Sequence, residues 1–149
     1  MKFGFGIPLF QEPAARDPYA RTYELCQLAE EVGFDVGSVG HHSFTPETGD
    51  PSAPFVLLSA IAARTARLRL STGIFLLPLH HPLAVAEQVA TLDRISGGRA
   101  ILGVGVGYRE YEYEGFGVPY RRRGRRMDEA IALIRQALET GRCELDGRE

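Results

Sequence analysis

Two apolar runs flank an amphipathic segment within the stretch 71–108, and this arrangement constrains the fold more than any other feature. The first run ends at Leu77, and the second ends in a ladder of glycines, Gly103, Gly105 and Gly107. The order indicates strand, helix, strand, which is the repeating unit of parallel sheets. Sites in parallel α/β proteins lie at the carboxyl ends of strands. We therefore predict a pocket where these two strands end.

The same alternation recurs along the whole chain. It predicts four strands, at Lys2–Ile7, Asp35–Gly40, Leu68–Leu76 and Ala100–Val106. The first helix, which ends at Gly33, should bury Leu25, Leu28, Ala29 and Val32 at spacings of three and four residues. Three more helices are expected at 53–65, 83–96 and about 121–140. The sequence thus predicts a single α/β domain over residues 1–149, with a parallel sheet and right-handed crossovers.

The closure of such a sheet has two solutions, a doubly wound open sheet or an eight-stranded barrel. A barrel needs about 250 residues, so four strand–helix units make half of one. The polar tail CELDGRE ends where a fifth strand would begin. We interpret the chain as the N-terminal half of a longer protein, or as a deliberately isolated half.

Composition excludes several classes of function. A net charge of −2 does not indicate binding to nucleic acid. The basic run Arg121–Arg126 is followed by acidic residues and is interpreted as a solvated helix face. The absence of a long apolar run predicts no membrane span, and the absence of a leader signature favours the cytoplasm. Cys26 and Cys143 fit neither a disulfide framework nor a metal site. A small molecule is therefore the expected partner.

Several residues at the predicted strand ends are candidates for chemistry. His41 and His42 follow the second strand, where imidazole would suit proton transfer and a solvated loop is the alternative. Gly73 interrupts the third strand, as a bulge or a close packing contact would. The glycine ladder departs from the dinucleotide pattern G-x-G-x-x-G, so we expect it to make room for a flat ring instead of a phosphate.

Two other features of the sequence are predicted to have no direct role in chemistry. His80 and His81 precede Pro82 and are predicted to form a solvated loop that leads into a helix. Aromatic side chains recur between Tyr108 and Tyr120, and we expect them to form a lid over the mouth of the pocket.

The motifs taken together resemble one family. EEVGFD, HHSFTP, STGIFLLPLHHP, AEQVATLDRISGGR and LGVGVGY occur in the order and spacing of the bacterial luciferase-like flavin monooxygenases and their coenzyme F420 relatives. The resemblance implies a TIM (β/α)8 barrel, of which this chain covers about four βα units. It also implies reduced FMN or coenzyme F420 as cofactor and a small organic substrate.

The resemblance also implies roles for particular residues. His42 matches the usual acid/base or flavin-contacting histidine, and His41 occupies a position that is commonly acidic, so an orienting carboxylate is expected to be missing. A non-prolyl cis peptide is expected at Gly73–Ile74, beneath the cofactor ring. The predicted cofactor contacts are His41, Gly73, Ile74, Leu76, Val106, Gly107 and Tyr111. Luciferase carries an arginine where Val106 stands, so that flavin contact is absent here. No metal ligands are predicted.

Two functions remain open at this point. The first is an oxidoreductase that either inserts oxygen with reduced FMN or transfers hydride with F420, with His42 handling the proton. The second is a non-catalytic half-barrel that forms homo-oligomers through its open sheet edges. The isolated chain is expected to be inactive and to bind its cofactor poorly, because the family holds the cofactor phosphate largely with later loops.

Overall fold

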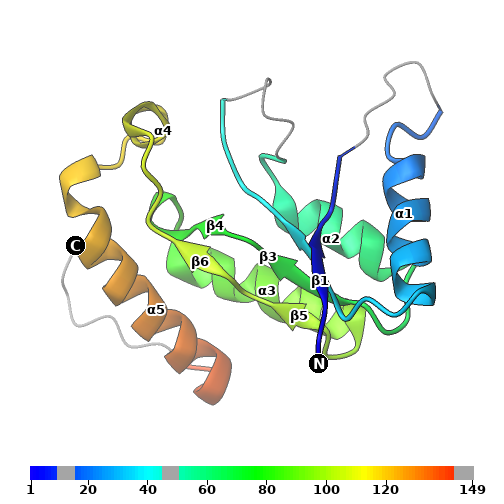
Figure 1. Cartoon of the computed structure of the whole chain (residues 1–149). Helices are drawn as coiled ribbons and strands as arrows, with labels where there is room; N and C mark the ends of the chain where they lie inside the picture. Colours follow the sequence, from blue (N-terminus) through cyan, green and yellow to red (C-terminus); the bar gives the residue numbers. More distant parts are fainter. Residues whose placement is uncertain (10–15, 45–50, 143–149) are drawn as a thin grey trace.

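The computed structural model describes residues 1–9, 16–44 and 51–142. Its main sheet has four parallel strands in the order β1-β2-β3-β5 (Figure 1). Their bounds are Gly4–Gly6 for β1, Val36–Val39 for β2, Arg69–Thr72 for β3 and Ala100–Ile101 for β5. Each strand pairs with the next one along the chain, as the alternation of strands and helices predicts. The α/β class and the parallel sheet are confirmed.

The third and fourth predicted strands are each divided in two. Beyond β3 and β5 the chain forms β4 (Phe75–Leu76) and β6 (Val104–Gly105), which pair with each other in a second parallel sheet. The peptide bond Gly73–Ile74 lies in the gap between β3 and β4 and is cis, as expected. At this gap the Thr72 hydroxyl donates to the carbonyl of Gly103 (2.8 Å) and accepts from its N–H (3.0 Å). A side chain thus replaces the backbone ladder where the strand is interrupted.

Five α-helices and two 3₁₀ turns are found in the described parts of the chain. The helices are α1 (Ala20–Glu31), α2 (Pro54–Ala62), α3 (Pro82–Ser96), α4 (Glu110–Gly115) and α5 (Arg123–Thr140). The turns are η1 (Leu77–Leu79) and η2 (Tyr120–Arg122). Gly97 and Gly141 close α3 and α5 in the left-handed conformation, which glycine adopts without a steric penalty. Helix α4 lies in a segment for which the sequence predicts only a loop.

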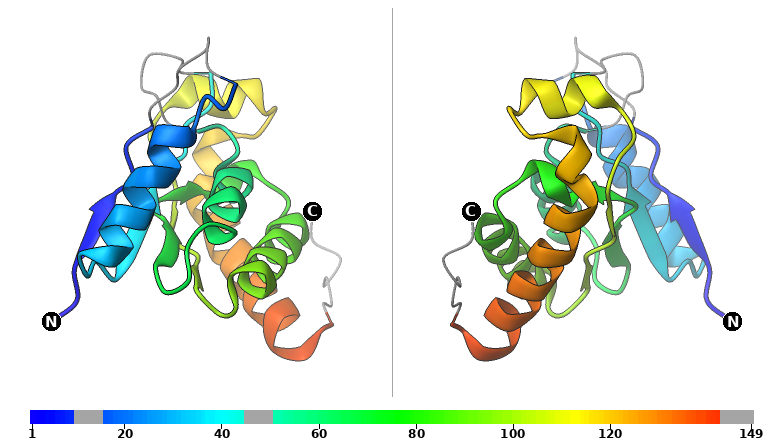
Figure 2. Two further views of the ribbon diagram at one scale, coloured as in Figure 1. Left: turned by 90° about the vertical axis from the view of Figure 1, so that its right-hand side faces the viewer. Right: turned by 90° about the vertical axis from the view of Figure 1, so that its left-hand side faces the viewer.

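The main core lies between the sheet and its helices. In Figure 1 the strands lie in front of α2 and α3, and Figure 2 shows α5 running beside α3. Right-handed crossovers between strands that pair in chain order place their helices on one face of the sheet. The predicted inner faces of α2 and α3 are confirmed, since Leu58, Ile61, Val85, Val89 and Leu92 are all buried. That four such units form half of a barrel stays a prediction.

The prediction for the buried face of α1 is only partly right, since Ala29 is buried and Leu25 is half-buried. Leu28 and Val32 are 51% and 66% exposed, and the buried residues of the helix are Thr22, Cys26 and Ala29. The buried residues of this helix therefore all have small side chains. Apolar periodicity alone selected a neighbouring stripe, because larger aliphatic residues weigh more in such a pattern.

The basic run at the start of α5 is only partly solvated. Arg121, Arg122 and Arg125 are exposed, as predicted. Arg126 instead donates from Nε to the carbonyl of Pro78 (3.0 Å), and the Arg123 guanidinium lies 3.9 Å from the ring centroid of Tyr120. Two arginines thus fix α5 against the end of η1 and against η2.

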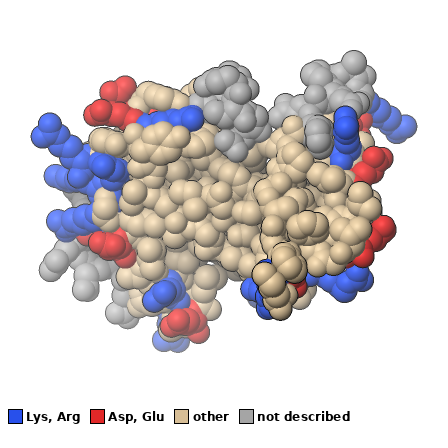
Figure 3. All heavy atoms as spheres, in the orientation of Figure 1, with Lys and Arg blue, Asp and Glu red and all other residues tan. Residues whose placement is uncertain are grey.

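The opposite face of the sheet is open and uncharged in its middle. Figure 3 shows that Lys, Arg, Asp and Glu side chains gather at the margins of this face. Among the described residues, no helix is long and apolar enough to cross a membrane. Cys143 and the tail CELDGRE lie outside the described residues. Self-association through open sheet edges stays a prediction.

Candidate functional site

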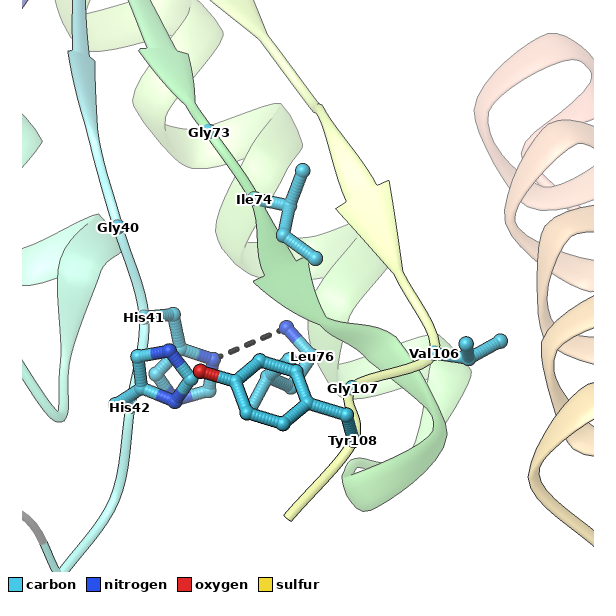
Figure 4. A pocket seen from close by; sticks show the side chains of 9 residues that line it. All are labelled: Gly40, His41, His42, Gly73, Ile74, Leu76, Val106, Gly107 and Tyr108. Atoms are coloured by element: carbon cyan, nitrogen blue, oxygen red, sulfur yellow. Dashed lines mark hydrogen bonds between the residues drawn. The ribbon is translucent and has the colours of Figure 1, made fainter.

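A cavity of about 470 Å³ opens where β2, β4 and β6 end. This volume falls within the usual range of ligand sites, about 300–1,000 Å³. The lining residues are Gly40, His41, His42, Gly73, Ile74, Leu76, Val106, Gly107 and Tyr108 (Figure 4). The structure therefore brings together every predicted site residue except Tyr111. Gly40 and Tyr108 belong to the cavity as well, although the sequence analysis did not select them as cofactor contacts.

The cis peptide forms one wall of this cavity. Gly73 is exposed there, and Ile74 is 42% exposed. A side chain at position 73 would collide with the hydroxyl of Ser38 on the neighbouring strand. Glycine at this position thus leaves the backbone itself, together with the Ile74 side chain, as the surface that a ligand meets.

The three glycines of the ladder have different neighbours. A Cβ atom at Gly103 would run into the Thr72 carbonyl oxygen, and one at Gly105 would run into the Ile74 side chain. These two glycines make room for the β3–β4 chain, and room for a flat ring stays a prediction. Only Gly107, which has a φ of 71°, belongs to the cavity lining.

His42 presents one side of its ring to the cavity and is held from the other. Its Nδ1 lies 3.2 Å from Oε1 and 3.4 Å from Oε2 of Glu112. Its side chain is 18% exposed, and the ring of Tyr108 stands edge-on to it at 6.0 Å between centroids. Contact between Nδ1 and a carboxylate leaves Nε2 as the nitrogen available to a ligand.

His41 lies deeper than the sequence suggests. It is 2% exposed, its ring stacks on Phe75 at 4.6 Å, and its Nδ1 accepts a hydrogen bond from the N–H of Leu76 (3.1 Å). Burial, which is the largest cause, together with the neighbouring His80 and His42 lowers the pKa of His41 to about 4, while a hydrogen bond with the backbone of Ser52 acts in the opposite direction. The ring is thus neutral near pH 7, and its proton lies on Nε2 because Nδ1 accepts from Leu76.

The lowered pKa of His41 predicts a loss of stability in mild acid. The folded pKa of about 4 lies below the ordinary value of 6.5, so the unfolded chain binds more protons between these pH values. The free energy of unfolding should therefore fall as pH drops from 6.5 towards 4, by up to about 3 kcal/mol. Burial also lowers the pKa of His80, which acts in the same direction. Urea unfolding at a series of pH values measures this loss.

A matched pair of variants isolates the contribution of His41. Asparagine at position 41 can still accept from the Leu76 N–H but does not titrate, so His41→Asn should lose less stability between pH 6.5 and 4.5. His81 is exposed, and His81→Asn should keep the full pH dependence. If His41→Asn and the unmodified chain lose stability equally over this range, the buried ring is not the cause.

The prediction of a solvated His80 is wrong. Its ring is half-buried between Phe75, at 4.6 Å, and Phe116, at 5.2 Å, and it lies 5.2 Å from the ring of His41. The turn η1 ends at Leu79 and directs His80 back towards the sheet. Only His81 stays in solvent. An aromatic column thus extends from the base of the cavity to α4.

The aromatic segment 108–120 contributes unequally to the site. Tyr111 is 44% exposed, accepts a hydrogen bond from Arg109 (3.0 Å) and is not among the lining residues. Tyr113 is 1% exposed, and its hydroxyl donates to the carbonyl of Val106. Tyr108 is the aromatic residue of this segment that faces the cavity. Cofactor contact by Tyr111 stays a prediction, and Tyr113 is a structural anchor of α4.

The sequence analysis missed Glu112. This residue of α4 has no exposed surface, and its carboxylate accepts from the N–H of Ser43 (2.7 Å) and contacts His42. The expectation that the site lacks an orienting carboxylate is therefore wrong, because another element supplies one. In the described part of the chain, no group of three His, Cys, Asp or Glu side chains could hold a metal ion.

The cavity thus combines a cis peptide with a histidine at the ends of parallel strands. The model of the luciferase-like monooxygenases matches this chain over residues 1–149. The chain belongs to the luciferase-like monooxygenase family. The resemblance seen in its motifs is thus confirmed over the whole length.

Solved structures of luciferase-like proteins share the fold. The monooxygenase RslO1 from Streptomyces bottropensis is 35% identical, with a TM-score of 0.81 over 91% of this chain and 42% of its own. The coenzyme F420-dependent tetrahydromethanopterin reductase from Methanopyrus kandleri is 28% identical, with a TM-score of 0.75 over 98% of this chain and 42% of its own. The oxygenating constituent of 3,6-diketocamphane monooxygenase from Pseudomonas putida, solved with FMN, shares the fold at 23% identity, with a TM-score of 0.74 over 90% of this chain and 39% of its own.

The chain spans about half, or less, of the length of the curated luciferase-like relatives that it matches. One of these, 4-hydroxyprotoasukamycin monooxygenase from Streptomyces nodosus subsp. asukaensis, is 34% identical over 85% of this chain and 34% of its own length.

Proposed function

We propose that the full-length gene product is an oxidoreductase that binds FMN or coenzyme F420 with the cofactor ring against Gly73–Ile74, and that acts on a small organic substrate. The observation that carries the proposal is the cavity itself. Its walls combine exposed backbone at the cis peptide with two imidazoles, and that of His42 has its Nδ1 on Glu112 and its Nε2 free to face a ligand.

The lining residues fit a flat heterocycle. Gly40, Gly73 and Gly107 carry no side chain, so a planar ring can approach the backbone closely at three points. Ile74 and Val106 are 42% and 39% exposed and offer apolar contact on the same cavity. A flat heterocycle gives up little favourable hydration when it binds against these apolar walls, because the faces of its ring are themselves apolar.

The residues of the chain have distinct tasks in this proposal. The bound cofactor would supply either oxygen activation or hydride transfer. Ile74, Leu76 and Val106 would exclude water from the ring and fix its plane. His42 would accept or donate one proton at Nε2, since Nδ1 faces Glu112. Which of the two cofactors is used decides whether the substrate is oxygenated or exchanges hydride with the cofactor.

Adding bulk to the cavity wall tests where the ring binds. Tryptophan in place of Ile74 would occupy the space against the cis peptide, so we expect cofactor affinity to fall at least about tenfold, or about 1.4 kcal/mol. Titration of the full-length gene product with FMN and, separately, with F420 measures this affinity through the absorption and fluorescence of each cofactor. Their distinct spectra also identify which of the two is bound.

Ile95 provides the matched control. It is 50% exposed on α3 and lies outside the cavity lining. Ile95→Trp should bind cofactor as the unmodified protein does. A protein that binds neither cofactor, or an Ile74→Trp variant with unchanged affinity, would remove the proposal.

A further inference from the structure

Glu112 is the one fully buried carboxylate among the residues that the structure describes. Burying an ionised carboxylate is costly unless hydrogen bonds replace the water that it loses. Its oxygens contact the Ser43 N–H at 2.7 Å and His42 Nδ1 at 3.2 and 3.4 Å. Both partners belong to the segment that follows β2 and reaches the cavity. The carboxylate therefore holds the segment that contains His42 and Ser43.

The contact determines which nitrogen of His42 carries the proton. An ionised carboxylate only accepts hydrogen bonds, so Nδ1 must donate and the neutral ring keeps its lone pair on Nε2. The same logic applies wherever a buried carboxylate orients a histidine that works as a base. His41 has the opposite tautomer, because its Nδ1 accepts from Leu76. Neighbouring histidines are therefore held in different protonation patterns by different partners.

Helix α4 is itself fixed to the strands that form the cavity. The buried Tyr113 donates from its hydroxyl to the carbonyl of Val106, and Phe116 packs on Phe44 at 5.7 Å between ring centroids. A side chain at Gly115 would collide with the ring of Phe44, so the helix and the β2 segment meet closely. Glu112 thus reaches His42 from an anchored helix.

We infer that Glu112 is a positioning residue that holds His42 as the Nδ1–H tautomer and aims Nε2 at the cavity. This inference deepens the proposed function, on which its consequence for turnover rests. It assigns the orienting acceptor to α4, 70 residues along the chain from His42, and not to the residue that precedes the histidine.

The tautomer of His42 is measured directly by long-range ¹⁵N–¹H NMR of the full-length gene product labelled at histidine, with the signal assigned through a His42→Gln variant. The unmodified protein should show a protonated Nδ1 and an unprotonated Nε2 at neutral pH. In Glu112→Gln the carbonyl oxygen is expected to stay on the Ser43 N–H, so the NH₂ group takes the place of Oε2 beside His42 Nδ1. Since NH₂ can only donate, it favours an unprotonated Nδ1, and the Nδ1–H preference should be lost. Turnover should fall about 10–100-fold, as for other residues that orient a working histidine.

Glu114 is the control on the same helix. It is exposed, so Glu114→Gln should leave both the tautomer and turnover unchanged. A protonated Nε2 in the unmodified protein overturns the inference without any variant, even if Glu112→Gln fails to fold. So does a folded Glu112→Gln protein that keeps the Nδ1–H signal and normal turnover. The NMR result does not require bound cofactor, so it stands apart from a failure of the proposed function.

Discussion

Replacing His42 by alanine is expected to lower turnover by about 10²–10⁴, the usual contribution of a positioned acid or base. The imidazole lies at the cavity with Nδ1 facing Glu112, so its removal takes away the side chain that we propose to accept or donate the proton. Some stability should be lost as well, because the buried Glu112 carboxylate loses one of its partners, so urea unfolding checks that the variant is folded. Turnover of the full-length gene product is followed through cofactor absorbance, with a substrate found by screening.

Variants of the other histidines distinguish a loss of proton transfer at His42 from a loss of stability. His81→Ala should have no effect on turnover, since His81 is exposed outside the cavity. His41→Ala should reduce stability first, because it removes a buried ring and the acceptor of the Leu76 N–H. A His42→Ala protein with near-normal turnover would show that the site works without an acid or base at this position.

Replacing Gly103 by alanine is expected to lower the free energy of unfolding by about 3 kcal/mol. The added Cβ would run into the Thr72 carbonyl and separate β3 from the strand beside it. The two hydrogen bonds of the Thr72 hydroxyl to Gly103 would be lost in the same movement. Because the displaced segment leads directly into Gly73–Ile74, cofactor affinity should fall as well. Urea unfolding and cofactor titration measure the two effects.

Gly124 is a suitable control for the same substitution. It lies within α5, and a Cβ atom there would have no neighbour within 4 Å. Alanine should stabilise the helix slightly, by about 0.5–1 kcal/mol, since it has the higher helix propensity. Equal stability of the Gly103→Ala and Gly124→Ala proteins would contradict the packing argument.

The sheet and most of the helices were predictable because they follow from local patterns. Apolar positions three and four residues apart located the inner faces of α2 and α3, including Leu58, Ile61 and Val89. The cis peptide at Gly73–Ile74 was expected only from the family resemblance, since glycine in a strand is equally typical of a bulge. The prediction for α1 was only partly right because its buried residues have small side chains, which periodicity weighs lightly.

The interior of the site was less predictable because it depends on contacts between distant residues. Glu112 sits in a run of acidic and aromatic residues that is typical of a solvated helix, and nothing local marks it as buried. Its partner His42 lies 70 positions away. His80 likewise precedes a proline in a polar stretch, and only the course of η1 brings it beneath α4. Such pairings become visible only when the strand ends are placed in space.

A crystal structure of the full-length gene product with bound FMN or F420 tests the central claim most directly. The cofactor ring should lie in van der Waals contact with the Gly73–Ile74 peptide, with Nε2 of His42 facing the ring or the substrate and Nδ1 still on Glu112. A ring bound elsewhere, or one that lies against the cis peptide while His42 points away from it, would contradict the account.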